Sequence, residues 1–261
     1  MRRRILLTIL LLPACSYLPE AHGDFINTPN VSRTVGAGVV GEGVLEVEGM
    51  ADIDPGDKVK SIIKVNAGLG PGLELAVGFG PYYSAGTGPD SHGPGDVTLS
   101  AKYKYADGTE GRPHGIVEFG TRFPTSDTGP SGRKGETDAL VATTLGQAFG
   151  DYSLLGTYEL GLLGDETSAT VVIEHAGSLA ASFRLSPQLR AFTEASMVHE
   201  PRASVTEWFG GCGAGWTISE GFELQGAVQF GLTDEAPDYM LVFGFAYELG
   251  PILPVMRGSG L

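Results

Sequence analysis

Hydrophobic and polar residues alternate along most of the chain from Gly43 onward, in segments of about nine to eleven residues. In residues 97–105, for example, Leu99 and Tyr103 would share one face of a strand while Lys102 lies on the other. Successive side chains of a β-strand point to opposite faces, so this period of two predicts strands with one apolar and one polar face. No helical period separates the segments, and the chain is therefore predicted to be all-β.

Twelve such strands are expected, at residues 43–52, 59–68, 73–82, 96–105, 114–123, 137–148, 152–161, 168–184, 189–198, 205–217, 222–232 and 239–249. Short connections such as 68–72 and 149–151 alternate with longer ones such as 83–95 and 124–136, with 106–113 as a longer exception. Outer-membrane barrels combine an even number of strands with short periplasmic turns and long extracellular loops. The prediction is a closed antiparallel transmembrane β-barrel of about 12 strands, with both barrel ends of the chain in the periplasm.

Aromatic residues support a membrane location. Three predicted strands carry two rings eight residues apart on one face, namely Trp208 and Trp216, Phe222 and Phe230, and Tyr239 and Tyr247. Eight residues span ~26 Å of strand, or about 20 Å across the membrane at a usual tilt, close to the apolar band of a membrane barrel. No charge interrupts the face between the rings. Cys212 falls on this face and is expected to behave as a small, unreactive hydrophobe.

The first residues predict export. Residues 1–23 resemble a secretory signal peptide, with arginines before an apolar run and a small-residue cleavage site that would release Asp24. A lipoprotein signal that ends before Cys15 is the alternative. The rest of the chain is then divided into a periplasmic lead-in (24–42), the β-barrel (43–249) and a C-terminal tail (250–261). Either signal leads out of the cytoplasm.

Composition narrows the class of protein. The chain has 17 Lys and Arg against 31 Asp and Glu, a net charge of −14, which argues against nucleic acid as a partner. Glycine supplies 40 of 261 residues without a collagen-like repeat, and a hydrophobic content of 42% is too high for a disordered chain. The two cysteines cannot build a disulfide framework once a leader containing Cys15 is removed.

Several motifs, in their order and spacing, resemble the Gram-negative outer-membrane barrel family named for the MetA pathway of phenol degradation. They are residues 43–48, 68–75, 93–97 followed by Lys102-Tyr103, Phe123-Pro124-Thr125, and 231–233 with Pro237-Asp238. The last strand also resembles the signal read by the barrel-assembly machinery, although it ends in Leu249 rather than Phe. The resemblance implies an outer-membrane channel or transporter for small molecules, aromatic or hydrophobic compounds included, with outer-membrane lipid and the assembly machinery as partners.

No cofactor, metal or catalytic site is expected. Residues 36–41 match the dinucleotide fingerprint, but no strand precedes them and no helix follows. The five histidines are scattered, without the spacing of metal ligands. His175 and Ser178 invite comparison with barrel hydrolases, yet three residues apart on one strand they would face opposite sides.

The polar faces of the predicted strands collect charges of both signs, which we expect to line the lumen. The candidate lumen residues are Glu46, Glu48, Lys64, Glu74, Lys102, Lys104, Glu118, Arg122, Glu159, Glu174, Arg184, Arg190, Glu194, Glu223 and Glu248. Two interpretations stay open: a lumen closed by mutual ion pairs, or a polar conduit whose selectivity these residues tune. The leading hypothesis is a channel or transporter. The alternatives are a structural or adhesive barrel that binds partners through loops 83–95 and 124–136, and a lipid hydrolase.

Overall fold

The computed structural model describes residues 32–34, 38–54, 58–85, 92–108, 112–125, 136–164 and 170–251. The expected signal peptide, Cys15 and all but two residues of the expected tail lie outside these ranges, so those assignments stay predictions. The described part of the chain forms no helix that is long and apolar enough to cross a membrane.

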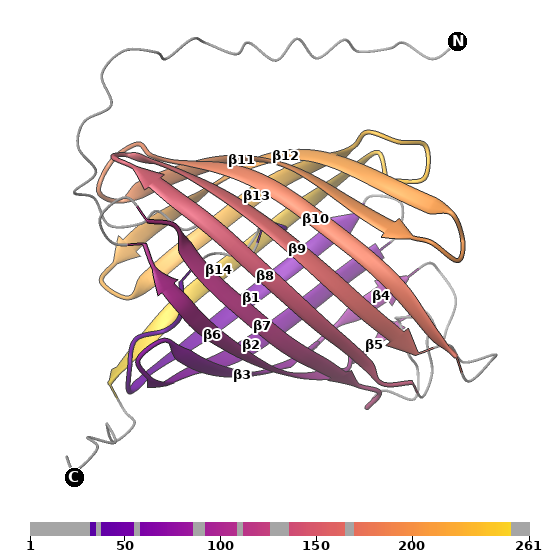
Figure 1. Ribbon diagram of the computed structural model, residues 1–261, viewed down its shortest axis with the longest axis horizontal. Helices are drawn as coiled ribbons and strands as arrows, with labels where there is room; N and C mark the ends of the chain where they lie inside the picture. The colour runs from indigo at the N-terminus through magenta and orange to yellow at the C-terminus, as the bar shows by residue number, and fades with distance from the viewer. Residues whose placement is uncertain are drawn as a thin grey trace.

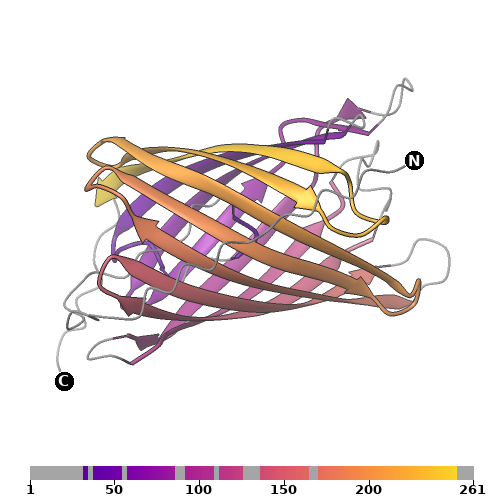
Figure 2. The same ribbon diagram turned by 90° about the horizontal axis from the view of Figure 1, so that it is seen from above.

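The described residues form one antiparallel sheet that closes on itself into a tilted barrel (Figures 1 and 2). The barrel strands are β1 (Val44–Asp54), β2 (Lys58–Gly70), β3 (Leu73–Phe79), β6 (Val97–Asp107), β7 (His114–Phe123), β8 (Asp138–Phe149), β9 (Tyr152–Gly164), β10 (Val171–Arg184), β11 (Leu189–Glu200), β12 (Val205–Ser219), β13 (Phe222–Gly231) and β14 (Tyr239–Pro251). Closure comes from β1, which pairs with β2 on one side and with β14 on the other. The prediction of a closed, twelve-stranded barrel is confirmed.

Each predicted segment overlaps one barrel strand, and residues 114–123 coincide with β7, while strands such as β2 and β9 are longer than predicted. The sequence missed two short strands in the connection 83–95. There β4 (Tyr83–Ala85) pairs with the first residues of β2 and with β5 (His92–Gly93), outside the closed ring of strands. Strands of three and two residues are too short to show a period, which explains why the pattern predicted a loop.

The two ends of the barrel differ in their connections. At one end, which we call the turn end, pairs of residues or short bends join the strands, and Gly72, Gly150 and Gly221 adopt φ angles of 76°, 64° and 75°. Positive φ is costly for other residues, so glycine permits these tight turns. At the opposite, loop end, the connections include residues 80–96 and 124–137. The expected alternation of short and long connections is present.

The barrel carries its apolar side chains on the outside. In β3, Leu73, Leu75 and Val77 are exposed, whereas Glu74 and Ala76 between them are buried. The paired aromatic residues of the last strands also point outward. Exposed rings on the outer face are those of Trp208, Trp216, Phe230, Tyr239 and Tyr247. This arrangement is the inverse of a water-soluble sandwich and matches a lipid-facing wall around a polar interior.

Candidate functional site: the barrel lumen

A short N-terminal segment occupies the inside of the barrel. The Ser32 hydroxyl donates to Glu194 Oε2 at 2.6 Å, and the backbone N–H groups of Arg33 and Thr34 donate to the same oxygen at 3.0 and 3.2 Å. Glu194 lies on β11 with 6% of its surface exposed, and Thr34 is 1% exposed. One buried carboxylate therefore anchors three consecutive residues to the inner wall.

Arg33 extends this contact along the inner wall to the two neighbouring strands, β12 and β13. Its Nε donates to Gln229 Oε1 on β13 at 2.8 Å, and Gln229 in turn donates through Nε2 to Glu194 Oε1 at 3.1 Å. The guanidinium carbon stands 3.9 Å from the centroid of the Phe209 ring on β12, a cation–π distance. A buried guanidinium needs such partners, because desolvation of an unpaired charge is costly. The segment is thus hydrogen-bonded to β11 and β13 and contacts β12 through the Phe209 ring.

Residues 38–41 contact the wall nearer the turn end. The Val40 N–H donates to Glu74 Oε2 at 2.8 Å, and the Gly43 N–H donates to the Gly68 carbonyl at 2.8 Å. A Cβ atom on Gly68 would lie 2.0 Å from the Gly41 oxygen, so only glycine allows so close an approach. The lead-in 24–42 was expected in the periplasm. Its described parts are residues 32–34 and 38–42, and of these Ser32, Arg33, Thr34 and Val40 hydrogen-bond to side chains of the inner wall.

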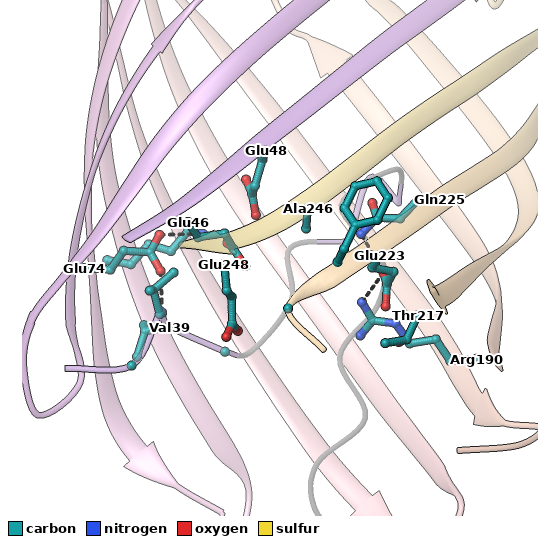
Figure 3. Close-up of a pocket in the computed structure, with 16 residues that line it drawn as sticks. Val39, Glu46, Glu48, Glu74, Arg190, Thr217, Glu223, Gln225, Ala246 and Glu248 are labelled. Atoms are coloured by element: carbon teal, nitrogen blue, oxygen red, sulfur yellow. Dashed lines mark hydrogen bonds and ion pairs between the residues drawn. The ribbon is translucent and has the colours of Figure 1, made fainter. Parts of the chain in front are cut away.

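The turn-end vestibule is a cavity of about 370 Å³ (Figure 3). Its charged lining consists of Glu46, Glu48, Glu74, Glu223 and Glu248 with Lys102 and Arg190. Lys102 Nζ lies 3.2 Å from Glu74 Oε1, and Arg190 Nη2 lies 2.6 Å from Glu223 Oε1. Asn66 Nδ2 donates to Glu46 Oε1 at 3.2 Å. Two of the five carboxylates are thus paired with a cationic side chain, and the carboxylates of the vestibule outnumber its cationic groups.

An apolar layer separates the vestibule from the anchored segment on four strands. Phe192 and Val242 are buried together, and Met50 and Ala227 pack against them. On β11 the inward residues run from Arg190 through Phe192 to Glu194, so the aromatic ring stands between the vestibule and the anchor. Narrow apolar zones in a polar pore resist hydration and restrict passage of ions.

Two further cavities lie toward the loop end. The middle cavity, of about 260 Å³, is lined by Lys64, Glu118, Arg122, Asp138, Glu159 and Glu174 together with apolar residues such as Leu140 and Leu163. Arg122 pairs with Asp138 and lies 3.3 Å from Asp96.

The loop-end cavity, of about 420 Å³, has a charged lining of Arg33, Asp52, Asp54, Lys58, Lys60, Glu207 and Glu235. Tyr83 of the β4 strand also lines it, and burial raises the pKa of the Tyr83 phenol. Cavities that are each lined by acidic and basic side chains therefore occur along the length of the barrel.

The structure brings most of the candidate lumen residues to these cavities. Those that line the vestibule or the middle cavity are Glu46, Glu48, Lys64, Glu74, Lys102, Glu118, Arg122, Glu159, Glu174, Arg190, Glu223 and Glu248. Glu194 is the anchor of the N-terminal segment. The other two residues lie outside the lining of the vestibule and the middle cavity. Lys104, three residues before the end of β6, pairs with the exposed Asp107 at 2.8 Å, and Arg184 is exposed at the last position of β10.

The sequence did not point to several residues of this site. Ser32, Arg33 and Thr34 belong to a lead-in without any period, and their partner Glu194 is 160 to 162 residues away. Gln225 and Gln229 lie on the polar face of the predicted strand 222–232, but only charged residues were expected to line the lumen. A prediction that included every inward-facing polar residue would have contained both glutamines.

The histidine and serine of the hydrolase hypothesis lie on different sides of the wall. Tyr158 Oη lies 2.7 Å from His175 Nδ1, and His175 stacks on His199 at the outer face with ring centroids 6.5 Å apart. Ser178 instead lines an interior cavity with Thr157. The two side chains cannot exchange a proton. Among the described residues, no three His, Cys, Asp or Glu side chains are grouped closely enough to hold a metal ion.

A closed ring of antiparallel strands, apolar outside and charged within, defines an outer-membrane β-barrel. The chain belongs to the family described as "Putative MetA-pathway of phenol degradation", whose pattern matches residues 33–249. The expected resemblance is confirmed. The match begins at Arg33, so it includes two of the three residues of the anchored segment, Arg33 and Thr34, as well as the barrel strands. The protein resides in the bacterial outer membrane. Short turns of such barrels face the periplasm, so we expect the turn end to be the periplasmic end.

Solved structures of similar fold are outer-membrane channels and porins. The COG4313 outer membrane channel from Pseudomonas putida F1 has a TM-score of 0.62 at 11% identity, over 80% of this chain and 97% of that one. The KdgM porin in complex with disordered oligogalacturonate has a TM-score of 0.57 at 10% identity, over 77% and 98%. The NanC porin has a TM-score of 0.54 at 10% identity, over 78% and 98%. No curated protein sequence matches the chain. Identities this low establish the fold alone.

Proposed function

We propose that this protein is a passive channel for small solutes across the outer membrane. The observation that carries the proposal is the series of charged cavities inside the wall, from the vestibule at the turn end to the cavity at the loop end. A barrel that served only as a scaffold would gain little from burying so many ionisable groups, because each one must be desolvated and paired. The channel fold of the similar structures supports the same conclusion.

The anchored N-terminal segment and the apolar layer are the narrow part of this path. Residues 32–34 are held to Glu194 on the loop side of Phe192, so both obstacles lie between the vestibule and the loop-end cavity. A solute that crosses the barrel must pass them or displace the segment. The proposed channel therefore conducts weakly in its resting state, with passage limited near Glu194.

Small aromatic compounds fit within this proposal. The family description refers to phenol degradation, and the middle cavity offers Leu140 and Leu163 beside Arg122 and Glu118. Such a lining suits a molecule with an apolar ring and a polar group, because ligand sites combine apolar surface with a few placed polar groups. Outer-membrane lipid around the exposed apolar face and the barrel-assembly machinery at the β14 terminus are the proposed partners.

Conductance in a planar bilayer tests the proposal directly. The refolded chain should give discrete openings, and the Lys102→Ala variant should alter their size because Lys102 lines the vestibule. Leu179→Ala is the matched control, since Leu179 is exposed on the outer face and contacts lipid. A barrel that is folded by its gel mobility yet silent in bilayers, with vesicles that stay tight to small sugars, contradicts the channel and favours a structural role.

A further inference from the structure

Resting on the proposed channel function, we infer that the lumen selects for cations and that the turn-end vestibule binds small organic ammonium ions. The starting point is the balance of charge in the vestibule. Five carboxylates line it, against the two cationic groups of Lys102 and Arg190. Acidic linings attract cations and lower their local free energy, and the apolar wall around them concentrates the field.

The same sign of excess recurs along the lumen. Four carboxylates and two cationic groups line the middle cavity, and four carboxylates and three cationic groups line the loop-end cavity. A cation therefore meets a favourable potential in every described cavity, whereas an anion meets an unfavourable one. The KdgM porin forms a complex with oligogalacturonate, which is an anionic sugar. The excess of carboxylates in the lumen of this protein would repel such a ligand.

A buried amide provides an independent indication of a ligand in the vestibule. Gln225 lines the vestibule, is 6% exposed, and donates through Nε2 to Glu223 Oε1 at 2.7 Å (Figure 3). Its Oε1 is buried without a hydrogen-bond donor. A buried acceptor of this kind is costly unless a donor reaches it, and none of the described protein groups does. An N–H group of a bound ligand would satisfy it.

The spacing of the carboxylates favours an organic cation over a metal ion. Within the described ranges, no three acidic or histidine side chains come close enough to coordinate a metal. Calcium and magnesium ions require several oxygen ligands at metal–oxygen distances of roughly 2 to 2.6 Å. Glu46, Glu48 and Glu248 are instead distributed around a cavity of about 370 Å³. A diammonium ion such as protonated 1,4-diaminobutane carries N–H donors on two separated nitrogens, which suits a dispersed set of acceptors with Gln225 among them.

Selectivity is measured as the reversal potential across a bilayer under a gradient of potassium chloride. The protein should favour potassium over chloride, and the triple variant Glu46→Gln, Glu48→Gln, Glu248→Gln should lower the permeability ratio several-fold toward unity. Glu220→Gln is the control, since Glu220 is exposed in the β12–β13 turn and should leave the ratio unchanged. A channel with no preference, or with a preference for chloride, overturns the inference and leaves the channel itself intact.

Binding is measured separately on the folded barrel in detergent, by calorimetric titration with 1,4-diaminobutane and with succinate as the anionic control. The diamine should bind and succinate should not. Gln225→Leu should weaken diamine binding about tenfold, the effect of one hydrogen bond to a charged group, and Gln225→Glu should strengthen it. A barrel that binds the diamine but never conducts would remove the channel and keep the site. Equal binding by the protein, the triple variant and Gln225→Leu would remove the site.

Discussion

Ser32 is hydrogen-bonded to Glu194 across 162 residues of sequence, with 2.6 Å between the hydroxyl oxygen and Oε2. The contact joins the first described residue of the chain to the inner face of β11. Because Arg33 and Thr34 donate to the same carboxylate, Glu194 holds the segment at three points. A single side chain of the wall therefore accepts hydrogen bonds from all three residues of the segment, and the contacts of Arg33 with Gln229 and Phe209 add to it.

Replacing Glu194 with alanine should release the segment and raise single-channel conductance. Each donor that loses its acceptor costs about 1 to 3 kcal/mol, which shifts the bound segment about tenfold to hundredfold toward the released state. Thr193→Ala is the control, because Thr193 faces outward beside Glu194. Conductance that is identical in Glu194→Ala and the unmodified protein would show that the segment does not limit passage.

Gly68→Ala should displace the N-terminal segment by a steric route. The added Cβ would lie 2.0 Å from the Gly41 oxygen and 2.6 Å from the Val40 oxygen, which are backbone atoms and cannot rotate away. We expect faster protease cleavage within the first residues and larger openings. Gly70→Ala is a close match as control, since its Cβ would have no heavy atom within 4 Å. The idea fails if both variants cleave at the same rate.

Phe192→Ala should widen the apolar layer between the vestibule and the anchor. Its ring is 3% exposed and packs with Val242, so its removal leaves space for water. We expect higher conductance and a loss of stability of about 3 to 5 kcal/mol, the usual range for a buried phenylalanine. Phe183→Ala, which removes an outer ring that meets Tyr152 edge to face, should lower stability without changing conductance. The reverse pattern would contradict this assignment.

Lys102→Met should destabilise the barrel, because the carboxyl group of Glu74 is 2% exposed and would lose its ammonium partner. Breaking one side of a buried pair costs about 3 to 5 kcal/mol, measurable by urea unfolding in lipid vesicles. The double variant Glu74→Gln, Lys102→Met should recover most of the loss. Lys104→Met should have no resolvable effect, since its partner Asp107 is exposed to solvent. Equal losses for Lys102→Met and Lys104→Met would refute the argument.

The strands could be predicted because each one contacts lipid on one side and the lumen on the other. This difference produces the period of two in β6 and β13, where Leu99 and Leu224 are exposed to lipid and Gln225 is buried inside. The β4–β5 hairpin lies outside the closed ring and has only five residues in its two strands, so no such contrast marks it. Alternation of apolar and polar residues indicates which face of a strand each residue occupies. It gives no signal where neither face of the strand contacts lipid.

The charged lining could also be predicted, because inward positions follow from the same period. The period does not report position along the barrel axis, which is why Arg184 was expected in the lumen although it is exposed at the end of β10. The occupied lumen could not be predicted at all. Ser32 reaches Glu194 only after the barrel has curved around it, and a glycine-rich lead-in without alternation carries no sign of such a distant partner.

The closure of β1 on β14 has a consequence for the order of assembly. The wall around Ser32–Thr34 is complete only when β14, the last of the described strands, pairs with β1. Residues 32–34 are synthesised well before β14, yet β14 completes the wall around them. If the seam between β1 and β14 forms before the segment has reached Glu194, the segment must enter through the mouth of a finished ring. The closed seam thus makes the relative timing of segment binding and strand pairing a part of the folding problem of this barrel.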